Sequence, residues 1–246
     1  MMGREIAIGD VHGCLKTLQA LVERHIKPTS EDTLIFVGDL VDRGPDSKGV
    51  IDYVRHLNSQ VCRVVTLMGN HEEVMVAAYE AQKTLPRRTL FRKPKNPLLQ
   101  QWMQLGGRET LQSFGVSNIL EMPEEYVVWM RNMPHYYETE HFIVVHAGFN
   151  FSLDNIFEDI NAMHWIRDFE YDPVKTGGRR VVHGHVPVSL EFIEQSVNNP
   201  SFGYVCIDNG CVYRNRVGMG RLIAFDLTNP MLYLQGCLDN VSPQVF

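Results

Sequence analysis

The first seventy residues repeat one unit, in which a short apolar run is followed by a turn and then by a helical pattern. Residues 5–8, 33–37 and 61–67 have the pattern of buried strands. Residues 14–23 have helical spacing, and a second helical pattern begins at Ser47, which is expected to cap it. Because strand and helix alternate, the strands are expected to be parallel, in a βαβαβ arrangement. The chain is therefore predicted to be α/β, with its site beyond the carboxyl ends of the strands.

The segment 82–133 differs in composition from the rest of the chain. Between Ala81 and Arg108 there are seven lysine or arginine residues, no acidic residue and three prolines. Helical patterns follow at residues 100–105, which end at Gly106-Gly107, and at 121–133. We predict a helical, basic cap inserted at about 82–133. Its charge is either a solvated surface or a means of attracting acidic phosphopeptides or polyphosphates.

The second half of the chain contains several short strand patterns, so a second sheet is expected. No linker or internal repeat divides the chain, and a length of 246 residues is compatible with one α/β domain. The predicted strands of this half are 136–138, 141–145, 179–182, 204–207, 222–225 and 231–234.

Composition argues against several classes of partner. The formal charge of -6 is not the basic balance of a nucleic-acid-binding protein. No apolar stretch approaches the roughly 18 residues that a membrane helix requires. The strand pattern begins at Glu5, which leaves no room for a signal peptide. We therefore predict a cytoplasmic protein with neither nucleic acid nor a membrane as partner; the oligomeric state is not indicated.

The cysteines form an odd and scattered set without a Cys-x-x-Cys pair. Neither a disulfide framework nor a zinc knuckle is suggested, and most of the thiols are expected to be buried or inert. Cys14 follows the first polar block and is either sensitive to oxidation or a packing residue. The five cysteines are Cys14, Cys62, Cys206, Cys211 and Cys237.

Carboxylate, imidazole and amide side chains follow the apolar runs in a fixed order. Two divalent cations about 3.5 to 4 Å apart can hold a hydroxide between them and polarise a phosphoryl group. Such a pair needs a bridging carboxylate, further anionic or imidazole ligands, and open positions for water and substrate. The side chains present match the ligand set of a two-metal phosphoesterase: Asp10, His12, Asp39, Asn70, His71, His146 and His185.

These residues lie in short motifs, here called blocks, at the ends of the predicted strands between residues 9 and 185. In these blocks the sequence resembles the phosphoprotein phosphatase family of metallophosphoesterases, of the bacterial and phage type. The resemblance implies one calcineurin-like domain over residues 1–246, built as a β-sandwich of two mixed sheets flanked by helices, with a small helical cap. It also implies two divalent metal ions, with manganese first and iron or zinc as alternatives. By the resemblance, Asp10 and His12 bind the first metal, Asp39 bridges, and Asn70, His146 and His185 complete the second.

The remaining roles follow from what phosphoryl transfer needs. The attack is expected to be in line, by a hydroxide that bridges the metals, with His71 as the general acid and Asp42 supporting its charged form. Arg43 and Arg167 can bind phosphate oxygens, although Arg167 can equally form a surface ion pair. His183 and Asp208 are expected to support the site at most.

Asp42 bears on the choice of substrate. Symmetrical dinucleoside tetraphosphate hydrolases share the blocks but typically carry alanine at this place, so the aspartate favours a phosphatase of monoesters, most of all phosphoserine or phosphothreonine in proteins. Residues 101–115 resemble a stretch of bacterial family members, with departures at Leu105 and Phe114. The dinucleoside tetraphosphatase remains the alternative. A phosphate-binding pseudoenzyme is less favoured, because it would not need His71, Asp42 and Arg43.

Overall fold

The computed structural model describes residues 3–85 and 95–242, and the first of its two sheets is mixed. Strands β1, β2 and β3 run parallel, as the sequence predicts, and β9 and β10 add antiparallel neighbours on the other side of β1. In sheet order the strands are β10 (Met231–Gly236), β9 (Arg221–Asp226), β1 (Glu5–Ile8), β2 (Thr33–Phe36) and β3 (Arg63–Thr66), and β8 (Asp208–Asn209) pairs with β9.

The second sheet is also mixed, so the prediction of two mixed sheets flanked by helices is confirmed. Strands β5, β6 and β7 are parallel, and β4 is antiparallel to β5. The last two predicted strands join the first sheet instead of this one. The order is β4 (Tyr136–Glu138), β5 (Phe142–Val145), β6 (Arg180–His183) and β7 (Tyr204–Cys206).

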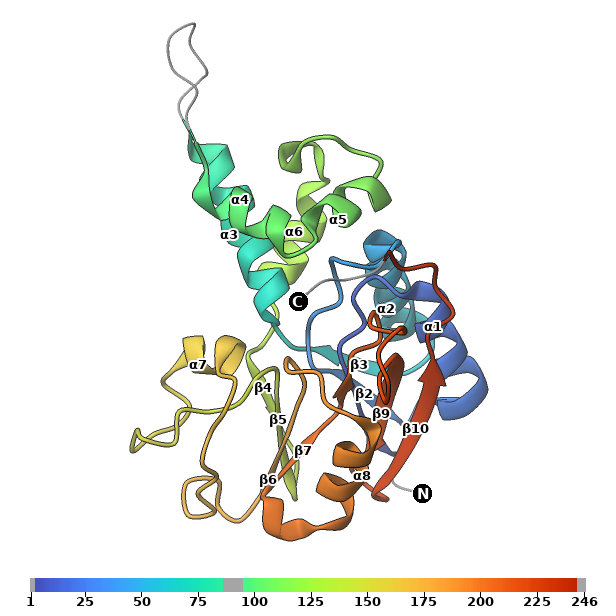
Figure 1. Ribbon diagram of the computed structural model, residues 1–246, viewed down its shortest axis with the longest axis vertical. Coiled ribbons are helices and arrows are strands. Elements are labelled where there is room, and N and C mark those ends of the chain that lie inside the picture. The colour runs from blue at the N-terminus through green and yellow to red at the C-terminus, as the bar shows by residue number, and fades with distance from the viewer. Residues whose placement is uncertain (1–2, 86–94, 243–246) are drawn as a thin grey trace, which may run out of the picture.

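The two sheets pack on each other, and alternation along the strands divides the core between the layers. In β1, Ala7 lies in the cluster between the sheets, together with Val144 and Val182 of the second sheet. Its neighbours Ile6 and Ile8 belong to a second cluster, shared with the helices that cover the outer face of the first sheet. This division follows from the two-residue period of side chains along a strand. Figure 1 shows α1 and α2 beside the first sheet and α8 at the lower end of the molecule.

The helices that follow β1 and β2 begin at the predicted places with one correction. Helix α1 (Leu15–Ala20) continues into a π-helical segment, Leu21–Ile26, and α2 spans Ser47–Gln60. The cap of α2 is Asp46 rather than Ser47, because the Asp46 side chain accepts a hydrogen bond from the backbone N–H of Gly49.

A group of helices between β3 and β4 stands above the two sheets in Figure 1. Gly106, in the left-handed conformation at φ 107°, separates α4 from α5, a helix that the sequence did not predict. The single domain and the cap at 82–133 stay predictions, and of the basic residues there, Arg87, Arg88, Arg92 and Lys93 lie outside the described residues. The helices are α3 (Asn70–Thr84), α4 (Pro97–Gln104), α5 (Gly107–Ser113), the 3₁₀ turn η2 (Ile119–Glu121) and α6 (Glu124–Arg131).

Two further helices escaped the sequence analysis because each is short. These are α7 (Ile160–Trp165) and α8 (Leu190–Asn198), and the 3₁₀ turn η3 (Pro200–Phe202) follows α8. Over the described part of the chain, no helix has the length and apolar character needed to cross a membrane.

Asp32 ties the start of β1 to the start of β2, and we expect Asp32→Asn to destabilise the fold. The Asp32 side chain accepts hydrogen bonds from the backbone N–H groups of Arg4 and Thr29, both at 2.8 Å, and pairs with Arg4 Nη2 at 2.7 Å. Burial alone would raise the pKa of Asp32, but these hydrogen bonds outweigh it and lower the pKa to about 2. Losing the charge should reduce the free energy of unfolding by about 1 to 3 kcal/mol at pH 7.

This effect should depend on pH with a definite sign. Because the pKa of Asp32 is lower in the folded than in the unfolded chain, its stabilisation is present above pH ~4 and is lost as the pH falls towards 2. Urea unfolding of wild type and variant at pH 7 and pH 3 checks this, with Asp154→Asn, at an exposed position, as control. An equal difference at both pH values would contradict the role of the charge.

Candidate metal centre

The predicted ligands gather at one edge shared by both sheets. Asp10, Asp39 and Asn70 follow β1, β2 and β3 of the first sheet. His146 and His185 follow β5 and β6 of the second sheet. Because parallel strands point the same way within each sheet, their carboxyl ends bring residues far apart in the sequence to a common place. The structure thus unites the separate blocks of the sequence.

The half of the cluster nearer the second sheet has nitrogen and oxygen acceptors facing one another. Asn70 Oδ1 lies 3.0 Å from His146 Nε2 and 3.1 Å from His185 Nδ1, and Asp39 Oδ1 lies 3.5 Å from His146 Nε2. Burial lowers the pKa of His146 well below its usual value, so its ring is neutral. His146 Nδ1 lies 3.0 Å from the carbonyl oxygen of Val37 and donates to it, which leaves the Nε2 lone pair facing two oxygen acceptors. A cation is the partner that such lone pairs lack.

The other half is built on His12. Its Nδ1 lies 2.9 Å from the carbonyl oxygen of Val41, which again turns the Nε2 lone pair inward. That Nε2 is 3.6 Å from Asp39 Oδ2 and accepts from Arg43 Nη1 at 2.9 Å. One lone pair serves one partner, so Arg43 has to release His12 when the imidazole binds a metal ion.

Asp39 belongs to both halves of the cluster. Its carboxylate forms one compact group of donor atoms with His12 and His71, and a second with His146 and His185, the atoms of each group lying within 4.8 Å of one another. A carboxylate with one oxygen towards each group is the geometry of a bridging ligand. The predicted bridging role of Asp39 is thus compatible with its position, and the mixed donor set suits Mn, Fe or Zn equally.

Asp10 lies beside these groups rather than within either. Its oxygens accept from the backbone N–H of His185 at 3.3 and 3.1 Å. Burial, together with the charges of Asp208 and Asp39, raises the pKa of Asp10 well above its usual value. Asp208 is itself buried and accepts from Gly210 N at 2.7 Å. So many buried carboxylates favour a site that receives positive charge.

His71 and Asp42 form a buried pair with two further partners that the sequence left unassigned. His71 Nδ1 lies 2.8 Å from Asp42 Oδ2. Trp102 Nε1 donates to both oxygens of Asp42, at 3.0 and 3.1 Å, and Thr110 Oγ1 donates at 2.6 Å. Trp102 and Thr110 come from α4 and α5. The helical group therefore reaches into the site, and the resemblance of residues 101–115 was the only signal of it.

Burial acts on both members of this pair in the direction of their neutral forms. It lowers the pKa of His71 to about 4, against the attraction of Asp39. It raises the pKa of Asp42 well above its usual value, against the hydrogen bonds from Thr110 and Trp102. A neutral pair carries the shared proton on Asp42, and an ionised pair carries the same proton on His71. The number of protons is equal in the two states, so the proton is assigned to the pair and not to either residue. His71 Nε2 is buried without a hydrogen-bond partner among the described residues and lies 3.8 Å from Asp39 Oδ2.

The two arginines and His183 differ in how close they lie to the cluster. Arg43 contacts His12 directly. Arg167 is exposed and follows α7. Burial is the main cause of the lowered pKa of His185, followed by the charge of His146, and the charge of Arg167 adds a smaller contribution. His183 is buried but belongs to neither group of donor atoms, and it lines a small cavity with Arg167. The role of Arg167 as a phosphate ligand stays a prediction.

The loops that carry the site adopt backbone conformations that no local sequence pattern predicts. Side chains other than glycine rarely take positive φ, and such strain concentrates at functional sites. Within the described residues, all but one of the non-glycine positions with positive φ belong to this cluster. They are His12 (φ 45°), Asp39 (φ 51°), Asp42 (φ 69°), Arg43 (φ 67°) and His185 (φ 69°), and the exception is Lys27.

Glu72 holds the Asp39 loop in this conformation. Its Oε2 accepts from the N–H groups of Asp39 at 2.8 Å and Gly69 at 3.2 Å. Its Oε1 accepts from Leu40 at 2.7 Å and Val41 at 3.2 Å. The side chain is fully buried. Glu72 follows the predicted site residues Asn70 and His71, but nothing in the sequence indicated that it binds another strand-end loop.

We expect Glu72→Gln to loosen that loop. A glutamine has one acceptor oxygen, and its amide would face two backbone donors with N–H groups of its own, so the free energy of unfolding should fall by about 3 kcal/mol. Metal affinity should fall with it, measured by elemental analysis after dialysis. Glu80→Gln is the matched control, because Glu80 lies on the same helix as Glu72 and the change removes only an exposed pair with Arg131 of α6. Unchanged stability and unchanged metal content would remove Glu72 from this role.

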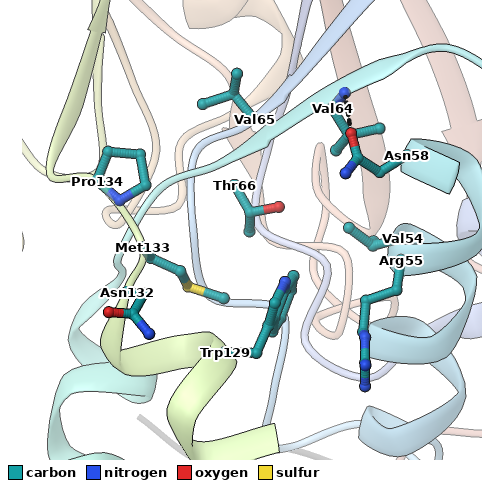
Figure 2. Close-up of a pocket in the computed structure, with 10 residues that line it drawn as sticks. All are labelled: Val54, Arg55, Asn58, Val64, Val65, Thr66, Trp129, Asn132, Met133 and Pro134. Atoms are coloured by element: carbon teal, nitrogen blue, oxygen red, sulfur yellow. Dashed lines mark hydrogen bonds between the residues drawn. The ribbon is translucent and has the colours of Figure 1, made fainter. Parts of the chain in front are cut away.

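A cavity of about 560 Å³ lies at the junction of α2, β3 and the end of α6 (Figure 2). None of its lining residues is a candidate ligand or belongs to the His71–Asp42 pair. It is therefore not assigned to the substrate. Its walls are Val54, Arg55, Asn58, Val64, Val65, Thr66, Trp129, Asn132, Met133 and Pro134.

Comparison with known proteins places this geometry among phosphoesterases. A family model described as calcineurin-like phosphoesterase matches residues 4–219. A symmetrical bis(5'-nucleosyl)-tetraphosphatase of Pseudomonas fluorescens is 33% identical over 146 residues, which are 58% of this chain and 41% of that protein. The corresponding protein of Pectobacterium atrosepticum is 47% identical over 72 residues, 29% of this chain and 25% of its own. The chain thus spans less than half of the length of these relatives.

Solved structures share the fold at low sequence identity. A candidate diadenosine tetraphosphatase has a TM-score of 0.59 at 20% identity and covers 96% of this chain and 95% of its own. A serine/threonine phosphatase from Saccharomyces cerevisiae has a TM-score of 0.60 at 13% identity, over 99% of this chain and 82% of its own. At these identities the likeness concerns the fold alone, and it covers nearly the whole chain.

Proposed function

Because this chain belongs to the calcineurin-like phosphoesterase family, we propose that it hydrolyses phosphate esters or anhydrides with two divalent metal ions. The observation that carries the proposal is the position of Asp39, whose carboxylate belongs to one group of donor atoms with His12 and to another with His146 and His185. When bound, a pair of divalent cations polarises the phosphoryl group and activates the attacking water.

In this proposal the chain's own residues divide the remaining work. Asp10, His12 and Asp39 would hold one ion, and Asp39, Asn70, His146 and His185 would hold the other. Arg43 and Arg167 bind phosphate oxygens and so neutralise charge on the transferring group. His71, with Nε2 directed at the cluster and Nδ1 on Asp42, gives its Nε2 proton to the leaving oxygen, while the proton shared with Asp42 stays on Nδ1.

Symmetrical dinucleoside tetraphosphates are the better supported substrate class. Relatives that are 33% and 30% identical over 146 residues of this chain are named as symmetrical bis(5'-nucleosyl)-tetraphosphatases. From the sequence alone this substrate was the second candidate, because Asp42 stands where symmetrical tetraphosphatases typically carry alanine. The relatives reverse that order, and the serine/threonine phosphatase prediction becomes the second candidate.

The His71–Asp42 pair is the specific observation that keeps phosphomonoesters as that second candidate. The alkoxide that leaves a phosphoserine is a strong base and needs a proton in the transition state, whereas a nucleoside diphosphate leaves as a weakly basic phosphate. A fully buried pair with Trp102 and Thr110 behind it suits the more demanding leaving group.

A side-by-side measurement of initial rates tests both candidates. The protein is stripped with a chelator, reloaded with Mn²⁺, and assayed on diadenosine tetraphosphate and on a phosphoserine peptide, with ADP and inorganic phosphate as separate readouts. We expect ADP from the dinucleotide and no turnover before reloading. Preferential release of phosphate from the peptide would restore the monoester prediction. Two bound metals without turnover of either substrate would point to a phosphate-binding pseudoenzyme.

The cytoplasmic location and the exclusion of nucleic acid and membrane partners stay predictions.

A further inference from the structure

Three of the five cysteines, scattered in the sequence, meet at one point in the fold. The Sγ atoms of Cys14, Cys211 and Cys237 all lie within 4.8 Å of one another. Cys14 precedes α1, Cys211 follows β8 and Cys237 follows β10. Cys14 and Cys211 are buried, and Cys237 is partly accessible. Because the three cysteines are far apart in the sequence and form no Cys-x-x-Cys pair, their spacing did not predict this trio.

The spacing of the trio fits a metal ion. Zinc binds thiolate sulfur at about 2.3 Å with tetrahedral geometry, which places the sulfur atoms roughly 3.8 Å apart. That separation lies within the 4.8 Å limit that the three atoms satisfy. A single buried thiol behaves as a small apolar group, but three soft ligands at one point form the larger part of a Cys₃ site.

The surroundings of the trio leave one coordination position to an oxygen. The carboxylate of Asp239 is already engaged, since it accepts from Lys16 N at 3.2 Å, from Thr17 N at 2.9 Å and from Thr17 Oγ1 at 2.6 Å. Its carbonyl oxygen lies 3.7 Å from Cys237 Sγ and 3.3 Å from Arg214 Nη1. That carbonyl or a water molecule can supply the fourth ligand.

We propose that Cys14, Cys211 and Cys237 bind one thiophilic divalent ion, with zinc as the natural occupant, in a structural site separate from the Asp and His cluster. Binding converts three thiols to thiolates and releases their protons to solvent. The ion ties the start of α1, two residues after His12, to the segments that follow β8 and β10. It thereby holds the first loop of the catalytic cluster against the C-terminal part of the chain.

Cadmium is a suitable probe because its ultraviolet charge-transfer band appears only when sulfur coordinates the ion. None of the residues proposed for the catalytic metals contains sulfur. The reduced, chelator-stripped protein is first reloaded with Mn²⁺ and then titrated with Cd²⁺. We expect one equivalent of cadmium to generate the band, and we expect Cys211→Ser to hold one zinc per chain fewer than the wild type when both are purified under reducing conditions.

Variants distinguish metal binding by the trio from binding by another cysteine and from binding at the catalytic centre. Cys211→Ser should weaken cadmium binding at least tenfold, whereas Cys62→Ser, also buried but outside the trio, should leave it unchanged. If Cys211→Ser does not fold, Cys237→Ser at the partly accessible position serves instead. Asp39→Asn should retain the zinc, which distinguishes this site from the catalytic centre whatever the activity proves to be.

Three results would overturn the proposal. One is the absence of the sulfur band at stoichiometric cadmium. Another is a band of equal strength in wild type and Cys211→Ser. The third is a disulfide between two members of the trio in protein purified with reductant, found by peptide mass analysis without further reduction.

Discussion

Replacing Asp39 by asparagine should abolish metal-dependent turnover, by more than about a thousandfold. The carboxylate serves both groups of donor atoms, and an amide has neither its charge nor a second equivalent oxygen. Losing about 4 kcal/mol of transition-state stabilisation corresponds to a factor of about a thousand in rate. Metal content should fall from two catalytic ions per chain to one or none. Elemental analysis and initial rates at saturating Mn²⁺ measure the two effects separately.

The control for this variant is Asp52→Asn, an isosteric change at a half-exposed position of α2. It should keep both the metal content and the rate. Circular dichroism and the unfolding temperature establish that the Asp39 variant is folded. A folded Asp39→Asn protein with two catalytic ions and wild-type turnover would show that the bridging assignment is wrong.

Replacing His71 by asparagine should retain both catalytic metals and lower turnover by about 10² to 10⁴-fold, the range that a general acid contributes. The loss should be largest on a phosphomonoester and smaller on diadenosine tetraphosphate, because the nucleotide leaving group requires less protonation. Comparing kcat on the two substrates therefore tests the role of the pair and the choice of substrate together.

His56→Asn, at an exposed position of α2, is the matched control and should leave turnover of both substrates unchanged. Equal losses on the ester and the anhydride would mean that His71 acts on the metal cluster rather than on the leaving group, as its place beside Asp39 also permits. Unchanged turnover on both would remove His71 from the mechanism.

Local patterns in the sequence were enough to predict the parallel strands β1, β2 and β3 and the polar residues at their ends. The two-residue and helical periods depend on neighbours in the chain, and the chemistry of a turn is visible in its residue types. Where the choice was between adjacent residues, as for the cap of α2, only the backbone geometry selected Asp46 over Ser47.

The contacts that complete the site depend on residues distant in the sequence. Glu72 holds the Asp39 loop, and Trp102 and Thr110 reach Asp42 from the helical group. No periodicity encodes such contacts, because they depend on how separate elements pack. The strained backbone at Asp39 and His185 is of the same kind, since it persists only where surrounding contacts outweigh its cost.

By itself, the amino-acid sequence determined which donor atoms this protein places at the ends of its strands, since residue identity and strand periodicity are local properties. Only the tertiary structure decided which of those atoms meet. The packing of the two sheets face to face made Asp39 common to two groups, and the pairing of β8 and β10 with β9 accompanies the approach of Cys211 and Cys237 to Cys14. Proximity of this kind arises from the burial of apolar faces over the whole molecule, which no short segment specifies.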